Sequence, residues 1–220
     1  MSSHQKLNPM TGSAFSLIEL LTVMAIISVM MAVTVPAFNV LKSTGDISTA
    51  AYDIASTLEQ ARAYAMANNT FVYVGFAEVS QMDATKQGTG QILMSAMGSK
   101  SGSRNFDSKN LVALTRMRKM PNVRLEDNIP NSGSLTRPVV QSAYQVASDA
   151  FKAQDKFEVS GVTFSKIVQF DPRGMASIQA SAASVSQWME IGLAGAQGSS
   201  PNNAVVVLDG VTGVAKVYRP

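Results

Sequence analysis

The chain has 220 residues, of which 46% are hydrophobic and 15% are charged, and its formal net charge is +3 at pH 7. This composition suits one globular domain with an apolar anchor, argues against wholesale disorder, and gives no strong attraction to a polyanion by itself. Cysteine is absent, which excludes a disulfide framework and thiolate chemistry.

The first predicted element is an apolar segment, 15–38, that contains a single carboxylate, Glu19. About 20 apolar residues suffice to cross a bilayer, and a charge inside such a span costs roughly 2.5–3.5 kcal/mol. A secretory signal peptide is shorter, and 32–34 is a poor cleavage site for one. A plain anchor explains the length of the segment but leaves Glu19 unexplained. We therefore expect a transmembrane helix whose carboxylate has a partner.

The sequence Ala14-Phe15-Ser-Leu-Ile-Glu19 resembles the processing site of type IV pilins and type II secretion pseudopilins. In that family a peptidase cuts before a Phe and the new amino terminus is methylated. A Glu stands fifth in the mature chain and a Pro twenty-second. Counted from Phe15, Glu19 and Pro36 occupy these two positions without a gap. One departure is that Ala14 stands where the family usually has Gly.

The resemblance implies a leader, 1–14, that prepilin peptidase removes between Ala14 and Phe15, followed by N-methylation of Phe15. It also implies an assembly role for Glu19, whose carboxylate would meet the protonated amine of Phe15 in a neighbouring subunit and so compensate both buried charges. The alternative is that Glu19 snorkels to the lipid headgroups. Pro36 is expected to kink or loosen the helix, or simply to end the membrane segment.

If the leader is removed, the mature chain has no imidazole, because the only histidine is His4. That excludes Ser-His-Asp triads and His-ligated zinc sites. Neither a GxxxxGK[ST] loop nor a GxGxxG motif is present. We expect no enzymatic activity, no cofactor and no metal, although a pair of carboxylates in a cleft would revive an enzymatic interpretation.

The helical pattern continues over 39–68 and becomes amphipathic. Charged residues fall on or beside the opposite face, and 68–69 is a reasonable stop. The apolar positions recur at spacings of three and four: Val40, Leu41, Thr44, Ile47, Ala51, Ile54, Leu58, Ala61 and Ala65. This stripe is expected to pack on the rest of the chain.

The region 69–220 is expected to form a β-rich head, because short β-type runs alternate with turns. A short helix is expected at 139–151, and loops at 98–109 and 131–137. The residues 171–174 read as a type I turn, and 209–213 as a hairpin turn. The expected strands are 71–76, 91–97, 110–117, 162–170, 176–179, 187–193, 204–208 and 214–218.

A second resemblance lies in the tail, in Ile167-Val-Gln-Phe-Asp-Pro-Arg-Gly-Met-Ala176 and in Val205-Val-Val-Leu-Asp-Gly-Val-Thr-Gly-Val-Ala-Lys-Val217. These stretches are similar to the C-terminal part of H-type minor pseudopilins and FimT-like pilins. They are similar too to the prepilin-like cassette protein D of verrucomicrobia, in which Ala also precedes the cut. The alternative is that both are merely good turn sequences of an antiparallel sheet.

A basic cluster follows in the head and contains Arg116, Arg118, Lys119 and Arg124. It is a possible DNA contact, since a basic patch attracts nucleic acid without sequence preference. No aromatic residue is interleaved for base stacking, and a charged edge strand is the simpler interpretation. Nucleic acid is therefore not the expected partner.

Together these features predict an α+β fold in which a long N-terminal transmembrane-plus-amphipathic helix packs on an antiparallel β-sheet head. The resemblance implies a minor pseudopilin that assembles into a periplasmic pseudopilus for protein transport by type II secretion. It also implies a single-pass location in the inner membrane with the head in the periplasm. The expected partners are other pilin subunits, prepilin peptidase, the inner-membrane assembly platform and lipid. The alternative is a minor type IV pilin for DNA uptake or adhesion.

Overall fold

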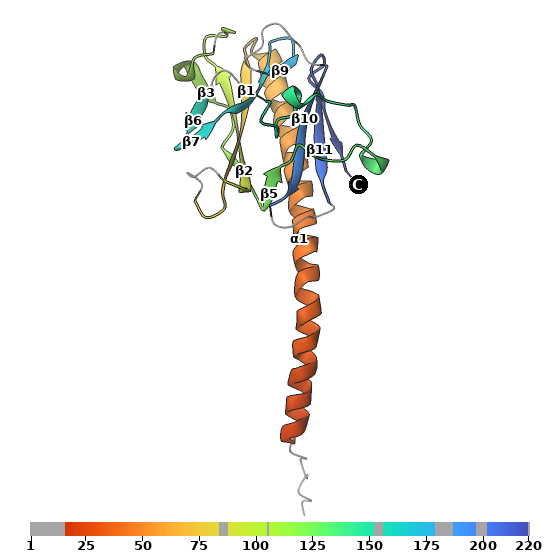
Figure 1. Ribbon diagram of the computed structural model, residues 1–220. Helices are drawn as coiled ribbons and strands as arrows, with labels where there is room; N and C mark the ends of the chain where they lie inside the picture. The colour runs from red at the N-terminus through yellow and green to blue at the C-terminus, as the bar shows by residue number, and fades with distance from the viewer. Residues whose placement is uncertain are drawn as a thin grey trace, which may run out of the picture. The chain divides into compact units, whose positions relative to one another are not determined.

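The structure is a computed structural model that describes residues 16–83, 88–104, 106–151, 156–178, 187–196 and 202–219, without the side chains of 33–44. The chain divides into two compact units, Met1–Val40 and Leu41–Pro220. The α-helix of the described residues, α1 (Leu17–Ala67), runs from the first unit into the second (Figure 1).

The predicted transmembrane segment, 15–38, is wrong. Among the described residues, α1 included, no helix combines the length and the apolar character needed to cross a membrane. The stretch 45–67 of α1 contains charged residues such as Asp53 and Glu59.

The predicted fold class and location are corrected with it. The described chain is mostly antiparallel sheet, and no helix among the described residues can span a membrane, so the expected transmembrane-plus-amphipathic helix is wrong. The single-pass inner-membrane location and the transmembrane character are contradicted by the same finding.

Six strands within the described residues form the first sheet, in the order β3-β2-β1-β8-β9, with β4 also paired to β2. Its longest pair joins β1 and β2 in antiparallel register, with Phe76 opposite Met94. The bounds are β1 (Val72–Ser80), β2 (Gly90–Ser99), β3 (Leu111–Ala113), β4 (Arg118–Pro121), β8 (Lys166–Phe170) and β9 (Ala176–Ile178).

A second antiparallel sheet, four-stranded within the described part of the chain, has the order β12-β11-β10-β5. A separate hairpin joins β6 to β7 through the tight turn at Ser160 and Gly161, both of which have positive φ. The bounds are β5 (Val123–Leu125), β6 (Phe157–Val159), β7 (Val162–Phe164), β10 (Trp188–Gly195), β11 (Ala204–Asp209) and β12 (Ala215–Tyr218).

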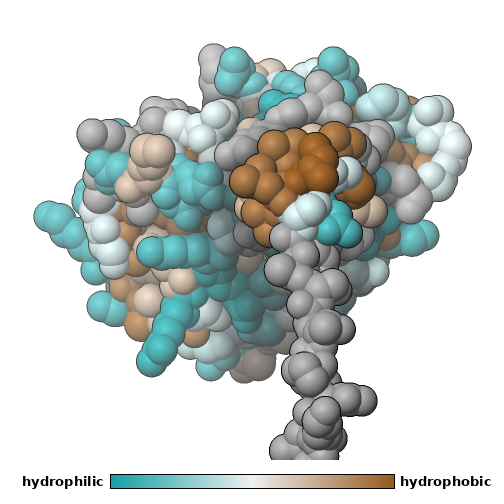
Figure 2. All heavy atoms as spheres, turned by 90° about the horizontal axis from the view of Figure 1, so that it is seen from below, coloured by the Kyte–Doolittle hydropathy of each residue, from teal (hydrophilic) through white to brown (hydrophobic). Residues whose placement is uncertain are grey.

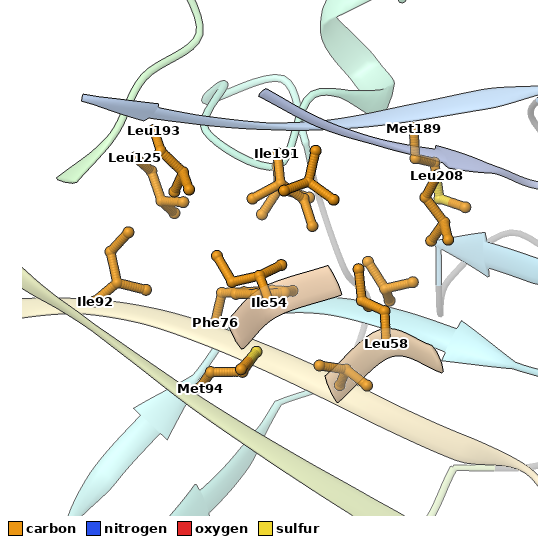
Figure 3. Close-up of a cluster of buried hydrophobic side chains, with 14 of the residues drawn as sticks. Ile54, Leu58, Phe76, Ile92, Met94, Leu125, Met189, Ile191, Leu193 and Leu208 are labelled. Atoms are coloured by element: carbon orange, nitrogen blue, oxygen red, sulfur yellow. The ribbon is translucent and has the colours of Figure 1, made fainter. Parts of the chain in front are cut away.

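The second part of α1 lies between these two sheets and forms the main core with them. Figure 3 shows Ile54 and Leu58 of α1 between Phe76, Ile92 and Met94 of the first sheet and Met189, Ile191, Leu193 and Leu208 of the second. Ile54 and Leu58 have no exposed surface. The stripe predicted from spacing is therefore buried at Ile47, Ile54, Leu58 and Ala61, whereas Val40 lies outside the described side chains.

The opposite face of the first sheet is covered by the β6–β7 hairpin. The rings of Phe157 and Phe164 stack with centroids 5.1 Å apart, and they lie directly over Gly75 of β1. A Cβ at Gly75 would stand 2.8 Å from the Cβ of Phe164, so this glycine permits the close approach of the hairpin. Sequence reasoning missed β6 because a three-residue strand leaves little periodicity to detect.

The outer face of the second sheet is covered by the segment 126–146, which is fixed by a buried ion pair. Arg137 and Glu190 meet at 2.9 Å, and their side chains are only 3% and 2% exposed. The guanidinium also donates to the carbonyls of Ile129, Pro130 and Leu135. At Gly192, a Cβ would clash with the carbonyl oxygen of Glu126, so the segment packs directly on the β10 backbone.

The helix predicted at 139–151 is wrong. This region contains the short 3₁₀ turn η3 (Ser142–Tyr144), and the Val146 amide donates to the Glu190 carbonyl of β10 at 2.8 Å. Pairing with a strand therefore replaces helical hydrogen bonds here. The two other 3₁₀ turns of the described residues are η1 (Ser108–Asn110) and η2 (Gly133–Leu135).

Both predicted turns are confirmed, and they lie together. The Gly174 amide donates to the Asp171 carbonyl at 2.9 Å, and the Gly213 amide donates to the Asp209 carbonyl at 2.7 Å. The Ala176 amide donates to the Gly210 carbonyl, and a Cβ at Gly213 would clash with the Gly174 carbonyl oxygen. The two tail motifs thus form one tightly packed junction between the sheets.

Candidate functional site

The start of α1 is fixed by two reciprocal hydrogen bonds between Ser16 and Glu19. The Glu19 amide donates to Ser16 Oγ at 3.2 Å, and the Ser16 amide donates to Glu19 Oε2 at 3.1 Å. This arrangement is a capping box, which satisfies two amides that the first helical turn leaves without partners. A carboxylate at this end also interacts favourably with the helix dipole. The box therefore holds the Glu19 carboxylate at the helix start.

The other polar side chains of this stretch also bond within the helix. Thr22 Oγ1 donates to the Ile18 carbonyl at 2.6 Å, and Ser28 Oγ donates to the Met24 carbonyl at 2.8 Å. Together with Ser16 and Glu19, these are all the polar side chains of 16–32. The stretch therefore presents no side-chain hydroxyl that needs a hydrogen bond from outside its own helix.

The surface of this stretch is apolar on every side. All residues from Ser16 to Ala32 are exposed, and Figure 2 shows the brown apolar cluster that they form where the described helix begins. A helix that is hydrophobic all round is normally buried, so this surface marks an interaction. The large exposed apolar side chains are Leu17, Ile18, Leu20, Leu21, Val23, Met24, Ile26, Ile27, Val29, Met30 and Met31.

The residues that the pilin resemblance singled out are only partly covered by the structure. Ala14 and Phe15, the predicted cleavage and methylation sites, lie outside the described residues. Pro36 lies within the bounds of α1, but its side chain is outside those described, so the kink stays a prediction. Glu19 lies in the first helical turn, and its predicted role in assembly also stays a prediction.

Of the four predicted basic residues, Arg118 and Lys119 lie in β4 of the first sheet, Arg124 lies in β5 of the second, and Arg116 precedes β4; two of the four already pair with carboxylates. Arg118 of β4 bonds to Asp53 of α1 at 3.1 Å. Arg124 of β5 bonds to Glu126 at 2.6 Å and to the Gly195 carbonyl. Arg116 and Lys119 are exposed. These pairs neutralise part of the charge that a nucleic acid would need.

Sequence reasoning missed Ser16, although the signal was present. Ser followed three residues later by Glu, just before an apolar run, is the sequence pattern of a capping box. Sequence reasoning considered only the charge of Glu19, and not the Ser16 amide to which its carboxylate bonds. The structure thus adds a specific local contact to a residue that the sequence had already selected.

Among the described residues of the head, Lys166 has a perturbed pKa. Burial lowers the pKa of Lys166 below its ordinary value of 10.5, although Glu78, Asp149 and Asp127 act to raise it. Its Nζ donates to the Ala147 carbonyl at 2.7 Å, so the ammonium ties β8 to a segment that precedes it in the chain. Among the described residues, no three His, Cys, Asp or Glu side chains are grouped to hold a metal ion.

Comparisons of this chain with protein-family models, with curated proteins and with solved structures find no match. The resemblance to pilins and pseudopilins therefore rests on the residues of the chain, and it is carried forward as a hypothesis.

Proposed function

We propose that this chain is a minor pilin-type subunit that assembles, through the apolar start of α1, into a pseudopilus for protein secretion. The observation that carries the proposal is the stretch 17–31, which exposes apolar side chains in all directions. Apolar surface of this extent is stabilised when another apolar surface removes it from water. Helices of neighbouring pilin subunits are the partners that the resemblance implies.

The polar groups of the stretch support this assignment. Thr22 and Ser28 are hydrogen-bonded to carbonyls of their own helix. Packing against another helix would therefore leave neither hydroxyl without a hydrogen-bond partner. Glu19 remains as the one charged group, and a neighbour's amine at Phe15 would compensate it on burial. The stretch would therefore pack laterally by apolar contact, with a charge pair fixing the stagger between subunits.

The alternative, a minor pilin that binds DNA for uptake, has no specific observation in its favour. Arg118 and Arg124 are held by Asp53 and Glu126, and they lie on strands of different sheets. No second function is therefore proposed.

The proposal is tested by cross-linking, which the absence of native cysteine makes specific. The full chain carrying Ile27→Cys is co-expressed with pilin-type subunits that carry one cysteine in their own apolar helices. A bis-maleimide reagent is then added, and the cross-linked species are quantified. We expect abundant heterotypic products, since Ile27 is 47% exposed on the proposed contact surface.

The matched control is Val139→Cys. Val139 is an aliphatic residue that is 85% exposed but belongs to the head. The cross-linking yield of Val139→Cys therefore measures random collisions and non-specific contact. Equal cross-linking yields from Ile27→Cys and Val139→Cys would show that the apolar stretch is not an assembly surface.

A further inference from the structure

We propose that Ser16 is a positioning residue for Glu19, so that the capping box prepares the carboxylate for assembly. This inference rests on the proposed function and deepens it. The supporting geometry is the pair of hydrogen bonds at 3.1 and 3.2 Å, in which the side chain of each residue accepts from the backbone amide of the other.

The box restricts where the carboxylate of Glu19 can lie. A free Glu side chain populates several rotamers. Because the Glu19 carboxylate accepts a hydrogen bond from the Ser16 amide, its side chain must point back toward the helix start. In the mature chain proposed above, Ser16 would be the second residue, so its amide would lie one residue from the new amino terminus. The carboxylate is thereby held at the end of the subunit where the charged groups of neighbours would meet.

Pre-positioning matters because assembly must otherwise order this side chain. Fixing a rotamer-rich side chain at an interface costs part of the binding free energy, and a side chain that is already fixed avoids that cost. Ser16 also satisfies the Glu19 amide, so the first turn stays helical when the surrounding surface is buried. Ser16 would therefore influence assembly through the orientation of Glu19 without contacting the neighbour.

Three substitutions separate the two roles of this pair. Ser16→Thr retains a hydroxyl that can accept from the Glu19 amide, and Ser16→Ala removes it. Glu19→Gln can retain the capping box, because Gln serves at this position, but it removes the charge. All are made in the full chain that carries Ile27→Cys, so the same cross-linking yield is measured.

We expect Ser16→Ala to lower the cross-linking yield about fivefold at limiting concentration, because the freed Glu19 side chain must then be ordered on assembly. Ser16→Thr should restore the wild-type yield. Glu19→Gln should lower the yield at least as much as Ser16→Ala, because the charge is lost although the box remains. The melting temperature of the head should not change in any of the three variants.

A double-mutant cycle distinguishes positioning from simple helix capping. If Ser16 acts mainly through Glu19, Ser16→Ala should lower the yield much less in the Glu19→Ala background than in the wild-type background. A yield of Ser16→Ala equal to wild type, or an independent loss of equal size in the Glu19→Ala background, would overturn the inference. Failure of the wild-type chain to cross-link better than the Val139→Cys control would instead overturn the proposed function.

Discussion

The two described stretches of α1 belong to the same helix but meet opposite conditions. In 45–67, the apolar residues follow the three- and four-residue spacing, and Ile54 and Leu58 are completely buried between two sheets. In 17–32, apolar residues occur on all faces and every one is exposed. The comparison shows that the head buries the apolar side chains of 45–67, whereas those of 17–32 are exposed and form the surface that we propose for assembly.

The largest expected effect is on the buried stretch. Leu58→Asp places a carboxylate among apolar side chains with no cation to pair, and we expect it to unfold the head or to destabilise it by more than about 4 kcal/mol. Thermal melting followed by circular dichroism measures the loss. Ser56→Asp is the matched control, because Ser56 is exposed on the same helix and should change stability by about 0.5 kcal/mol or less. Similar melting of the two variants would mean that the stripe does not face the core.

The next largest effect concerns the segment that covers the second sheet. Arg137→Met leaves the buried Glu190 carboxylate without its cation, and we expect a loss of about 3–5 kcal/mol. Adding Glu190→Met should recover part of this loss, because the uncompensated charge is removed. Arg173→Met breaks a pair whose arginine is 78% exposed, and it should cost less than about 1 kcal/mol. Chemical denaturation of the four proteins gives the comparison, and equal losses for Arg137→Met and Arg173→Met would refute the role of the buried pair.

The smallest effect is a pH dependence at Lys166. Its folded pKa is lowered by burial, so the unfolded chain binds more protons as the pH approaches 10.5, and stability should rise with pH in the window just below that value. Lys166→Met removes the titrating group and should remove this part of the slope. Denaturation midpoints of both proteins, measured at several alkaline pH values, give the difference. A difference between them that does not vary with pH would contradict the assignment.

The contrast within α1 also shows what the sequence could reveal. The stripe Ile47, Ile54 and Leu58 was predictable, because helical spacing directly encodes which face is buried. The long strands β1, β2, β10 and β11 were predictable from their apolar β-type runs, and the turns at 171–174 and 209–213 from their turn residues. Among these elements, local pattern and final structure agree.

Elements that depend on distant partners were not predictable. Arg137 and Glu190 are 53 residues apart in the chain, and nothing local indicates that they pair. The predicted helix at 139–151 was lost because Val146 bonds to a strand of the second sheet, which is a tertiary contact that overrides local propensity. Of the expected strand at 110–117, only β3 (Leu111–Ala113) forms, and β4 (Arg118–Pro121) follows it; both pair with β2.

In the candidate site, the sequence selected Glu19 but assigned it a surrounding that the structure does not support. A transmembrane helix was predicted from the apolar run, whereas no helix among the described residues is long and apolar enough to cross a membrane. The capping box with Ser16 was encoded locally and could have been identified from its spacing. The partner that we propose for the apolar surface would lie in another molecule, and a single chain contains no direct record of it.

The most direct test of the central claim is a substitution that charges the exposed stretch without touching the core. Ile26 is 55% exposed, so Ile26→Asp should leave the melting temperature of the head unchanged. In the Ile27→Cys background, it should reduce cross-linking to pilin-type subunits by more than tenfold, because a carboxylate would be buried in an apolar contact. Wild-type cross-linking by Ile26→Asp, or a lowered melting temperature, would contradict the account that the first stretch of α1 serves assembly and the second stretch serves the fold.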